Sequence, residues 1–194
     1  MNICFFCAAS DLEPRYTDPA RELARMVAEQ GHTLVWGGSD RGLMRDIASA
    51  AQGAGGRIVG ISMESLKLTA RADADQMIIA RDLGERKALF LQHSDAVVAL
   101  VGGTGTLDEL TDLFELRRHG VHNKPLVVLN TDNFYKGLRL QYERMQYDGL
   151  LDRLPRPIDQ LIAFADTPTE AMELLTSTSV HSPQPSLIFS NEVM

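Results

Sequence analysis

The stretch VGGTGTLDE, residues 101–109, combines glycines and threonines in a pattern suited to binding an anion. It follows an apolar run and precedes a pattern that predicts a helix from about Leu107. Backbone N–H groups at a helix start attract negative charge, and glycine lets a ligand approach the backbone closely. The alternative is a tight connection between a strand and a helix. The residues that we predict to bind a phosphate group are Gly102, Gly103, Thr104, Gly105 and Thr106.

Glu109 lies three residues after Thr106 and admits two interpretations. The spacing fits a capping box, in which the two side chains satisfy backbone donors at a helix start. The alternative is a carboxylate with a functional role beside the predicted phosphate site. The local spacing alone leaves both interpretations open.

Arg86 and Lys87, in RDLGERKALF, fall in the first turn of another predicted helix. Cations at that end of a helix oppose its dipole, at a cost of about 0.3–1 kcal/mol each. A bound anion nearby would turn this unfavourable placement into a useful one. The alternative is a charged turn exposed to solvent.

A second glycine-rich loop, WGGSDRGLM at residues 36–44, also lies between a predicted strand and helix. It lacks the G-x-G-x-x-G pattern of dinucleotide-binding loops. Gly37 and Gly38 allow the backbone to approach a ligand closely, or they form a tight turn. The sequence does not distinguish these two roles.

Metal and redox chemistry find little support in the sequence. The five histidines are scattered, and no His, Cys and Asp cluster has the spacing of metal ligands. Cys4 and Cys7 form a C-x-x-C motif, but no helical pattern begins until about Asp18, and a redox pair normally opens a helix. We therefore predict buried structural thiols, no metal site and no cofactor.

Short apolar runs alternate with amphipathic ones along the chain, which predicts a parallel sheet with helices on both faces. The first helical pattern has Asp18 as its N-cap, Pro19 as its first residue and Gly31 as its end. The runs typical of strands are residues 3–7, 33–36, 57–61, 77–80, 95–101, 125–130 and 161–165. The helical patterns are residues 18–31, 42–55, 84–94, 106–120, 133–149 and 167–177.

The expected fold is therefore a doubly wound, Rossmann-like α/β domain of about seven strands, over residues 1–179. Residues 180–194 contain two prolines and no clear period, which predicts a loose tail. Ligands of such sheets bind beyond the carboxyl ends of the strands, where both glycine-rich loops fall.

The composition is that of a soluble globular protein, with 44% hydrophobic and 23% charged residues. A net charge of -7 argues against nucleic-acid binding through a broad basic surface. No apolar run reaches membrane-spanning length, and the first ten residues lack a basic signal-peptide region. We expect a cytoplasmic protein without membrane or nucleic-acid partners.

Taken together, these stretches resemble the Lonely Guy (LOG) family of cytokinin riboside 5′-monophosphate phosphoribohydrolases, long mislabelled as lysine decarboxylases. The ordered matches are GGSDRGLM at residues 37–44, ERK at 85–87, VGGTGTLDE at 101–109 and HNKPLVVLNTDNFYKGL at 122–138. The step of 16 residues from Arg86 to Gly102 also fits the family, and the resemblance runs from residue 3 to about 175. Val101 departs from the family pattern, which has proline there.

The resemblance implies an enzyme that splits the N-glycosidic bond of a nucleoside 5′-monophosphate, such as AMP or an N6-modified cytokinin nucleotide. The products would be a free base and ribose 5-phosphate. Matched by position, Glu109 and Arg86 are the catalytic pair. The matched substrate-binding residues are Gly37, Gly38, Met44, Lys87 and the five residues from Gly102 to Thr106.

The resemblance also implies a homodimer. The apolar positions of the helix at 106–120 offer a seam for it, although their period equally fits burial against the chain's own sheet: Leu107, Leu110, Leu113 and Phe114. A non-catalytic carrier of a nucleotide or cofactor is the alternative function, because it would share the glycine-rich loops without needing Glu109 and Arg86. A decarboxylase would need a lysine for pyridoxal phosphate, and neither Lys87 nor Lys124 has a supporting motif.

Overall fold

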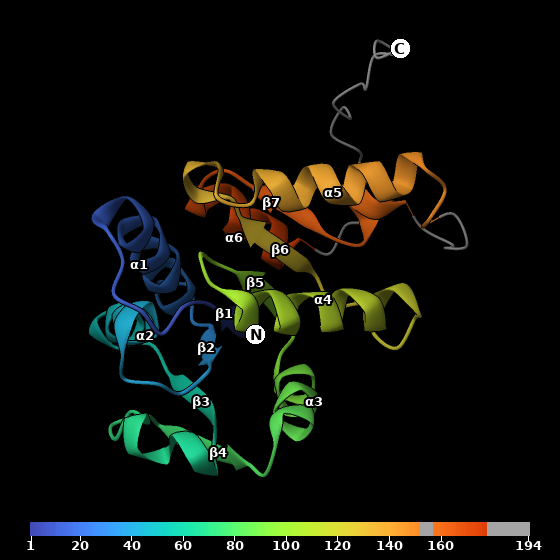
Figure 1. Ribbon diagram of the computed structural model, residues 1–194. Helices are drawn as coiled ribbons and strands as arrows, with labels where there is room; N and C mark the ends of the chain where they lie inside the picture. Colours follow the sequence, from blue (N-terminus) through green and yellow to red (C-terminus); the bar gives the residue numbers. More distant parts are fainter. Residues whose placement is uncertain (152–156, 178–194) are drawn as a thin grey trace.

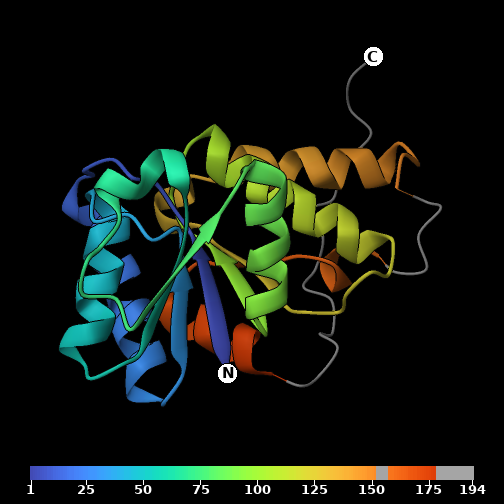
Figure 2. The same cartoon turned by 90° about the horizontal axis from the view of Figure 1, so that it is seen from below.

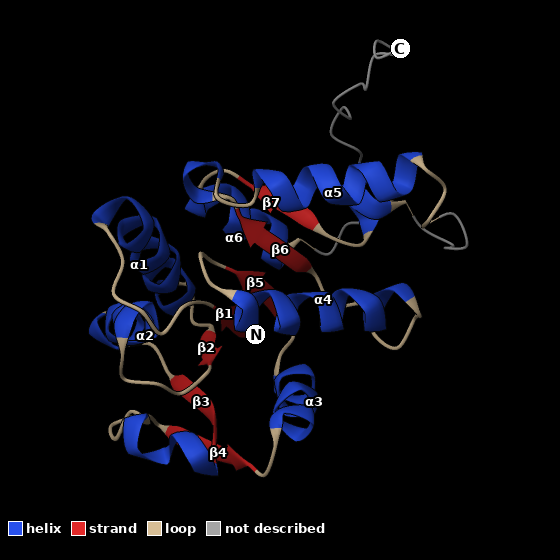
Figure 3. Ribbon diagram, viewed as in Figure 1, coloured by secondary structure: helices blue, strands red, loops and turns tan. Residues whose placement is uncertain are grey.

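The computed structural model describes residues 1–151 and 157–177, and its strands form one parallel sheet flanked by helices (Figures 1 and 3). The strands are β1 (Asn2–Phe6), β2 (Thr33–Trp36), β3 (Ile58–Met63), β4 (Gln76–Ala80), β5 (Ala96–Ala99), β6 (Leu126–Leu129) and β7 (Ala163–Ala165). The α-helices are α1 (Pro14–Glu29), α2 (Gly42–Gly53), α3 (Leu83–His93), α4 (Thr104–Arg118), α5 (Lys136–Tyr147) and α6 (Pro168–Thr176). Three short 3₁₀ turns complete the list: η1 (Glu64–Thr69), η2 (Thr131–Asn133) and η3 (Ile158–Gln160).

The sheet order is β4-β3-β2-β1-β5-β6-β7, and every pairing is parallel. The chain winds outward from β1 to β4, then returns to the other side of β1 and winds outward from β5 to β7. The predicted doubly wound, Rossmann-like fold is therefore confirmed. The winding direction reverses between β1 and β5, and such a switch point opens a crevice at the carboxyl ends of the two strands.

Alternation along each strand divides the core into two layers (Figure 2). Ile3 and Phe5 of β1 pack with α1, α2 and α6, whereas Cys4 and Phe6 pack with α3, α4 and α5. Successive side chains of a strand point to opposite faces, so a sheet buried on both faces needs a continuous apolar run. Cys4 and Cys7 are free, buried thiols on these two faces, which agrees with the structural role predicted for them.

Helix α1 begins earlier than the sequence pattern predicts. Pro14 occupies its first turn with Glu13 as the N-cap, so Asp18 is not the cap and Pro19 lies inside the helix. Proline lacks an N–H, and Pro14 fits the first turn, where that donor has no helical partner. Pro19 removes one later helical hydrogen bond, a loss that the buried face of α1 offsets. Gly31 ends this region as predicted, with a φ of 74° that favours glycine.

The apolar side of α4 does not form an exposed seam. Leu110, Leu113 and Phe114 are at most 4% exposed and belong to the chain's own core, with the half-buried Leu107 packed against it. The homodimer thus stays a prediction from the family resemblance, with no support from this helix. The predicted tail at 180–194 lies outside the described residues. Across residues 1–151 and 157–177, no helix combines the length and apolarity that a membrane span requires.

Candidate active site

Helix α4 begins at Thr104, three residues before the predicted start, and this corrects the capping-box interpretation. Gly103 is the N-cap in extended conformation, and among the described residues no side chain caps the helix. Thr106 is buried against Gly102, where an added Cβ would lie 2.1 Å from the threonine Oγ1. Thr106 and Glu109 are therefore inside the helix, and Glu109 points into the protein, where it is 8% exposed.

Arg86 of α3 meets Glu109 in the interior of the site. Its Nη1 group donates to Glu109 Oε1 over 2.9 Å, while its Nε and Nη2 groups donate to the carbonyls of Ile61 and Gly37. The guanidinium also lies over the ring of Phe90, 4.9 Å from the centroid. The exposed charged turn considered for Arg86 is therefore wrong. The side chain reaches from α3 across the carboxyl ends of β3 and β2 to α4.

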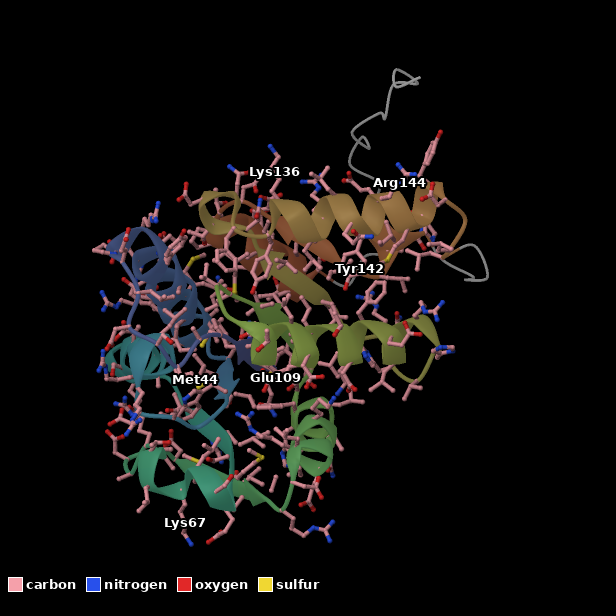
Figure 4. The ribbon with its side chains drawn as sticks, in the orientation of Figure 1. Met44, Lys67, Glu109, Lys136, Tyr142 and Arg144 are labelled. Carbon is pink, nitrogen blue, oxygen red and sulfur yellow. The ribbon has the colours of Figure 1, made fainter. Side chains whose placement is uncertain are left out.

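Gly37 and Met44 complete the surroundings of this ion pair. A Cβ at Gly37 would lie 2.6 Å from Arg86 Nη2 and 2.8 Å from the Met44 methyl group. Gly37 is thus required by the close passage of Arg86, and Met44 lies against the same point. Figure 4 labels Met44 and Glu109 near the middle of the view, whereas Lys136 extends outward from α5. Gly38 has a φ of 75° and packs under Met77, which is a turn role.

Burial dominates the electrostatics of Glu109. Removal from water raises its pKa to about 7, against Arg86, which lowers it; Asp108 raises it further and Lys87 lowers it. A carboxyl group with this pKa holds its proton in part of the molecules at neutral pH. Such a group suits proton transfer at physiological pH, and strongly perturbed carboxyls in interior sites are typical of catalytic centres.

Lys87 lies beside the site but is already paired. Its ammonium group contacts Asp108 at 3.3 Å and Asp112 at 3.1 Å, both on α4. The hydrogen bonds that the ammonium group donates to Asp112 and Asp108 raise the pKa of Lys87. Lys124, the other lysine considered for a decarboxylase, donates to the carbonyls of Leu91 and Ser94. Both lysines therefore have structural partners.

Two of the helix starts at the carboxyl edge of the sheet have some of their N–H donors occupied. At α2, the N–H groups of Leu43 and Met44 donate to the carbonyls of Ser10 and Ala8. At α3, Asp82 caps the helix by accepting from the Glu85 N–H over 2.8 Å. Part of the unpaired N–H groups at each of these two helix starts is therefore satisfied within the chain.

Helix α4 presents a different start, at the switch point itself. No described side chain caps it, and added Cβ atoms at Gly103 or Gly105 would meet nothing within 4 Å. Neither residue has a positive φ, so neither turn geometry nor close packing explains why glycine stands at these two positions. The open space in front of the first N–H groups suits the approach of an anion. Gly102 differs, because its N–H donates to the buried hydroxyl of Tyr135.

Sequence reasoning missed several groups that hold this site. Tyr135 lies in the stretch 122–138 that matches the family, but the sequence assigns it no role, and the carbonyls of Ile61 and Gly37 have no side-chain signature at all. Asp82, by contrast, stands three residues before Glu85 in a capping pattern that the sequence displays.

Among the described residues, no three His, Cys, Asp or Glu side chains gather as metal ligands would.

The fold and the site define a Rossmann-like α/β protein with a buried Arg–Glu pair near the switch point of its sheet. Comparison with known proteins gives the family. Residues 44–175 match the family model described as possible lysine decarboxylase. The chain is 38% identical over 152 residues to the cytokinin riboside 5′-monophosphate phosphoribohydrolase of Mycobacterium tuberculosis, covering 77% of this chain and 79% of that protein.

A plant relative covers more of the chain. The cytokinin riboside 5′-monophosphate phosphoribohydrolase LOG5 of Arabidopsis thaliana is 33% identical over 185 residues, which are 93% of this chain and 78% of the relative. The chain therefore belongs to the LOG family, as its motifs predict. A solved molybdenum cofactor binding protein of Rippkaea orientalis is 21% identical with a TM-score of 0.64, over 89% of this chain and 92% of that one. At that identity the likeness shows the shared fold alone.

Proposed function

We propose that this protein hydrolyses the N-glycosidic bond of nucleoside 5′-monophosphates, either AMP or its N6-modified relatives. The names of the relatives in Mycobacterium tuberculosis and Arabidopsis thaliana support this reaction class. The observation that carries the proposal is the position of Glu109. It is buried against Arg86, one helical turn beyond the uncapped start of α4.

The chemistry requires a carboxylate close to C1′ of the ribose. When the C1′–N bond breaks, the ring gains positive charge, as in glycoside cleavage. Ionised Glu109 stabilises that charge and orients the attacking water, whose oxygen bonds to C1′. The water loses one proton and the departing base gains one, so the products are a free base and ribose 5-phosphate. Arg86 holds Glu109 in place and favours its ionised form.

The 5′-phosphate would bind the N–H groups that open α4, after Gly102. One turn of helix rises about 5.4 Å, so these donors and Glu109 are separated by roughly the span of a ribose with its 5′ carbon. The phosphate would then hold C1′ beside the carboxylate. Binding energy gained at the phosphate helps to place the reacting carbon.

The test is to incubate the purified protein with AMP and with an N6-prenylated AMP, and to separate the products by chromatography. Release of adenine, or of the modified base, in equal amounts with ribose 5-phosphate is the expected result. Tight binding of the nucleotide without release of base would overturn the proposal and support the carrier function. Loss of carbon dioxide from lysine would instead support the decarboxylase description of the family model.

The Glu109→Gln variant is the matched control in this assay. It keeps the size of the side chain and removes its charge, so any base release that persists at the wild-type rate comes from a contaminating enzyme or a different group.

A homodimer and a cytoplasmic location are further expectations from the family resemblance and the composition, and they stay predictions.

A further inference from the structure

A buried tyrosine hydroxyl fastens the loop between β5 and α4. Tyr135 is 3% exposed, and its hydroxyl donates to the carbonyl of Leu100 over 2.7 Å. Burial raises the pKa of Tyr135, and the hydrogen bond that the same hydroxyl accepts from the Gly102 N–H lowers it. One side-chain oxygen therefore binds both the carbonyl of Leu100, just after β5, and the N–H of Gly102, the first glycine of the loop.

Tyr135 is itself fixed by contacts from three directions. Its backbone N–H donates to Asn130 Oδ1 over 2.9 Å, and Asn130 Nδ2 donates to Asp166 beyond β7. Its ring meets Phe134 edge to face at a centroid distance of 4.9 Å, and Phe134 meets Tyr16 of α1 in the same way at 6.0 Å. The hydroxyl consequently stands at a point set by the carboxyl ends of β6 and β7.

The connection that carries Tyr135 is also defined in backbone conformation. Asp132 and Asn133 adopt φ values of 52° and 58°, in the left-handed region that Asp and Asn enter more readily than other residues with a side chain. Asp132 also pairs with Arg15 at 3.1 Å, which ties this connection to the start of α1.

We propose that Tyr135 is a positioning residue for the phosphate of the substrate, acting through the loop and not by touching the ligand. Holding the Leu100 carbonyl and the Gly102 N–H together turns the following N–H groups, from Gly103 onward, toward the open space in front of α4. This inference rests on the proposed function, because it assigns the phosphate of the substrate to that space.

Two observations separate a positioning role from simple packing. The hydroxyl bonds to backbone on both sides of the bend, whereas the ring alone would fill the core. The N–H groups beyond the bend, from Gly103 onward, are not oriented by a capping side chain, because no described side chain caps α4. Misplacement of a binding group by about 1 Å costs up to about a hundredfold in activity, so a loosened loop has a measurable effect.

The experiment compares Tyr135→Phe with Tyr142→Phe. Both replacements keep a buried ring on the α5 side of the sheet, and Figure 4 shows Tyr142 between α5 and α4. Tyr142 is 6% exposed and stacks on Phe114, and its hydroxyl is buried without a hydrogen-bond partner among the described residues. The control therefore removes a hydroxyl of the same kind that does not hold the loop. Asn130→Ala, which frees the Tyr135 backbone, is the second variant.

Two quantities are measured for each variant: the affinity for ribose 5-phosphate by calorimetry, and KM and kcat for AMP. We expect Tyr135→Phe to weaken ribose 5-phosphate binding and raise KM by about tenfold to a hundredfold, with a smaller change in kcat. Asn130→Ala should shift KM in the same direction. Tyr142→Phe should leave both quantities within about twofold of the wild type, since the loop is untouched.

An unchanged affinity and KM in Tyr135→Phe would overturn the inference, whatever its effect on melting temperature, and would leave the hydroxyl as a packing element. Absence of ribose 5-phosphate binding by the wild type would overturn it as well. Failure of the proposed function has a different signature. The wild type would bind ribose 5-phosphate, Tyr135→Phe would bind it more weakly, and neither would release base from AMP.

Discussion

Arg86 Nη1 donates a hydrogen bond to Glu109 Oε1 over 2.9 Å, and the two side chains are only 9% and 10% exposed. A buried ion pair is a poor source of stability, because removing both charges from water offsets much of their attraction. Arg86 reduces this penalty by donating to two carbonyls as well. The arrangement is better explained by chemistry that needs a carboxylate held at one place away from bulk water.

Glu109→Gln is expected to lower kcat for AMP by about 10²–10⁴, the usual contribution of such a group. The amide keeps a hydrogen-bond acceptor for Arg86 but has no charge to stabilise positive charge on the ribose. The change is measured by base release under saturating AMP, with circular dichroism as the control for folding. A turnover rate within a few-fold of the wild type would show that Glu109 has only a structural role.

The stability of the wild type should depend on pH through Glu109. Its pKa in the folded protein is raised from 4.5 to about 7, so the folded state holds the proton more tightly than the unfolded state. The stabilisation that comes from this tighter proton binding is therefore fully present below about pH 4.5. It is lost as pH rises through 7, which lowers the free energy of unfolding by at most about 3 kcal/mol. Urea unfolding from pH 5 to pH 8 should show this loss in the wild type relative to Glu109→Gln. Parallel curves for the two proteins would contradict the raised pKa.

Arg86→Ala and Lys87→Ala form a matched pair in the same helical turn. Removing Arg86 leaves Glu109 buried without its partner, which is expected to cost about 3–5 kcal/mol of unfolding free energy at pH 8. The cost should be smaller at pH 5, where Glu109 is protonated. Lys87 is the more exposed cation, so its removal should cost about 1 kcal/mol or less. Equal losses for the two variants would show that Arg86 does not depend on burial with Glu109.

Much of the fold follows from local patterns that the sequence displays. The apolar runs at 95–101 and 125–130 are typical of strands buried on both faces, and the alternation with amphipathic helices predicts a parallel sheet. The failures came at helix starts. Pro19 resembles a first-turn proline, but Pro14 takes that position five residues earlier, and the buried face of α1 tolerates the second proline.

The sequence points to residues of the candidate site but not to the contacts that they make. Thr106 and Glu109 have the spacing of a capping box, and only the packing of Thr106 beneath Gly102 excludes it. Arg86 and Lys87 are neighbours of similar charge, yet one points into the site and the other pairs with α4. Such choices depend on which helix lies opposite, and the sequence does not encode that locally. The same holds for Tyr135, whose partner carbonyl lies 35 residues away.

The glycines of the loop should respond to alanine in opposite ways. Gly105 lies in the first turn of α4 in open space, so Gly105→Ala is expected to stabilise the fold by up to about 0.5–1 kcal/mol. The added methyl group should at the same time raise KM for AMP, because it narrows the approach to the helix start. Gly102→Ala should destabilise the protein, since its Cβ would lie 2.1 Å from Thr106 Oγ1. Thermal unfolding and KM are measured together. A stabilised Gly105→Ala with unchanged KM would place the phosphate elsewhere.

AMP should be cleaved far better than adenosine, which lacks only the phosphate. Arg86 and Lys87 are both paired with carboxylates, so the N–H groups at the start of α4 remain as donors for the phosphate. A hydrogen bond to a charged group contributes about 1.5–3 kcal/mol, so loss of two would cost about 3–6 kcal/mol. At about 1.4 kcal/mol per factor of ten, this corresponds to about 10²–10⁴ in kcat/KM.

Part of this difference should appear in kcat, because the phosphate helps to place C1′ against Glu109. The measurement compares kcat/KM for AMP and adenosine at one pH and one salt concentration. Adenosine with added inorganic phosphate is the control, since a free anion that fills the same space should restore some of the lost rate. A ratio of AMP to adenosine within about tenfold would mean that fewer than one charged hydrogen bond is made, and the start of α4 would not be the phosphate site.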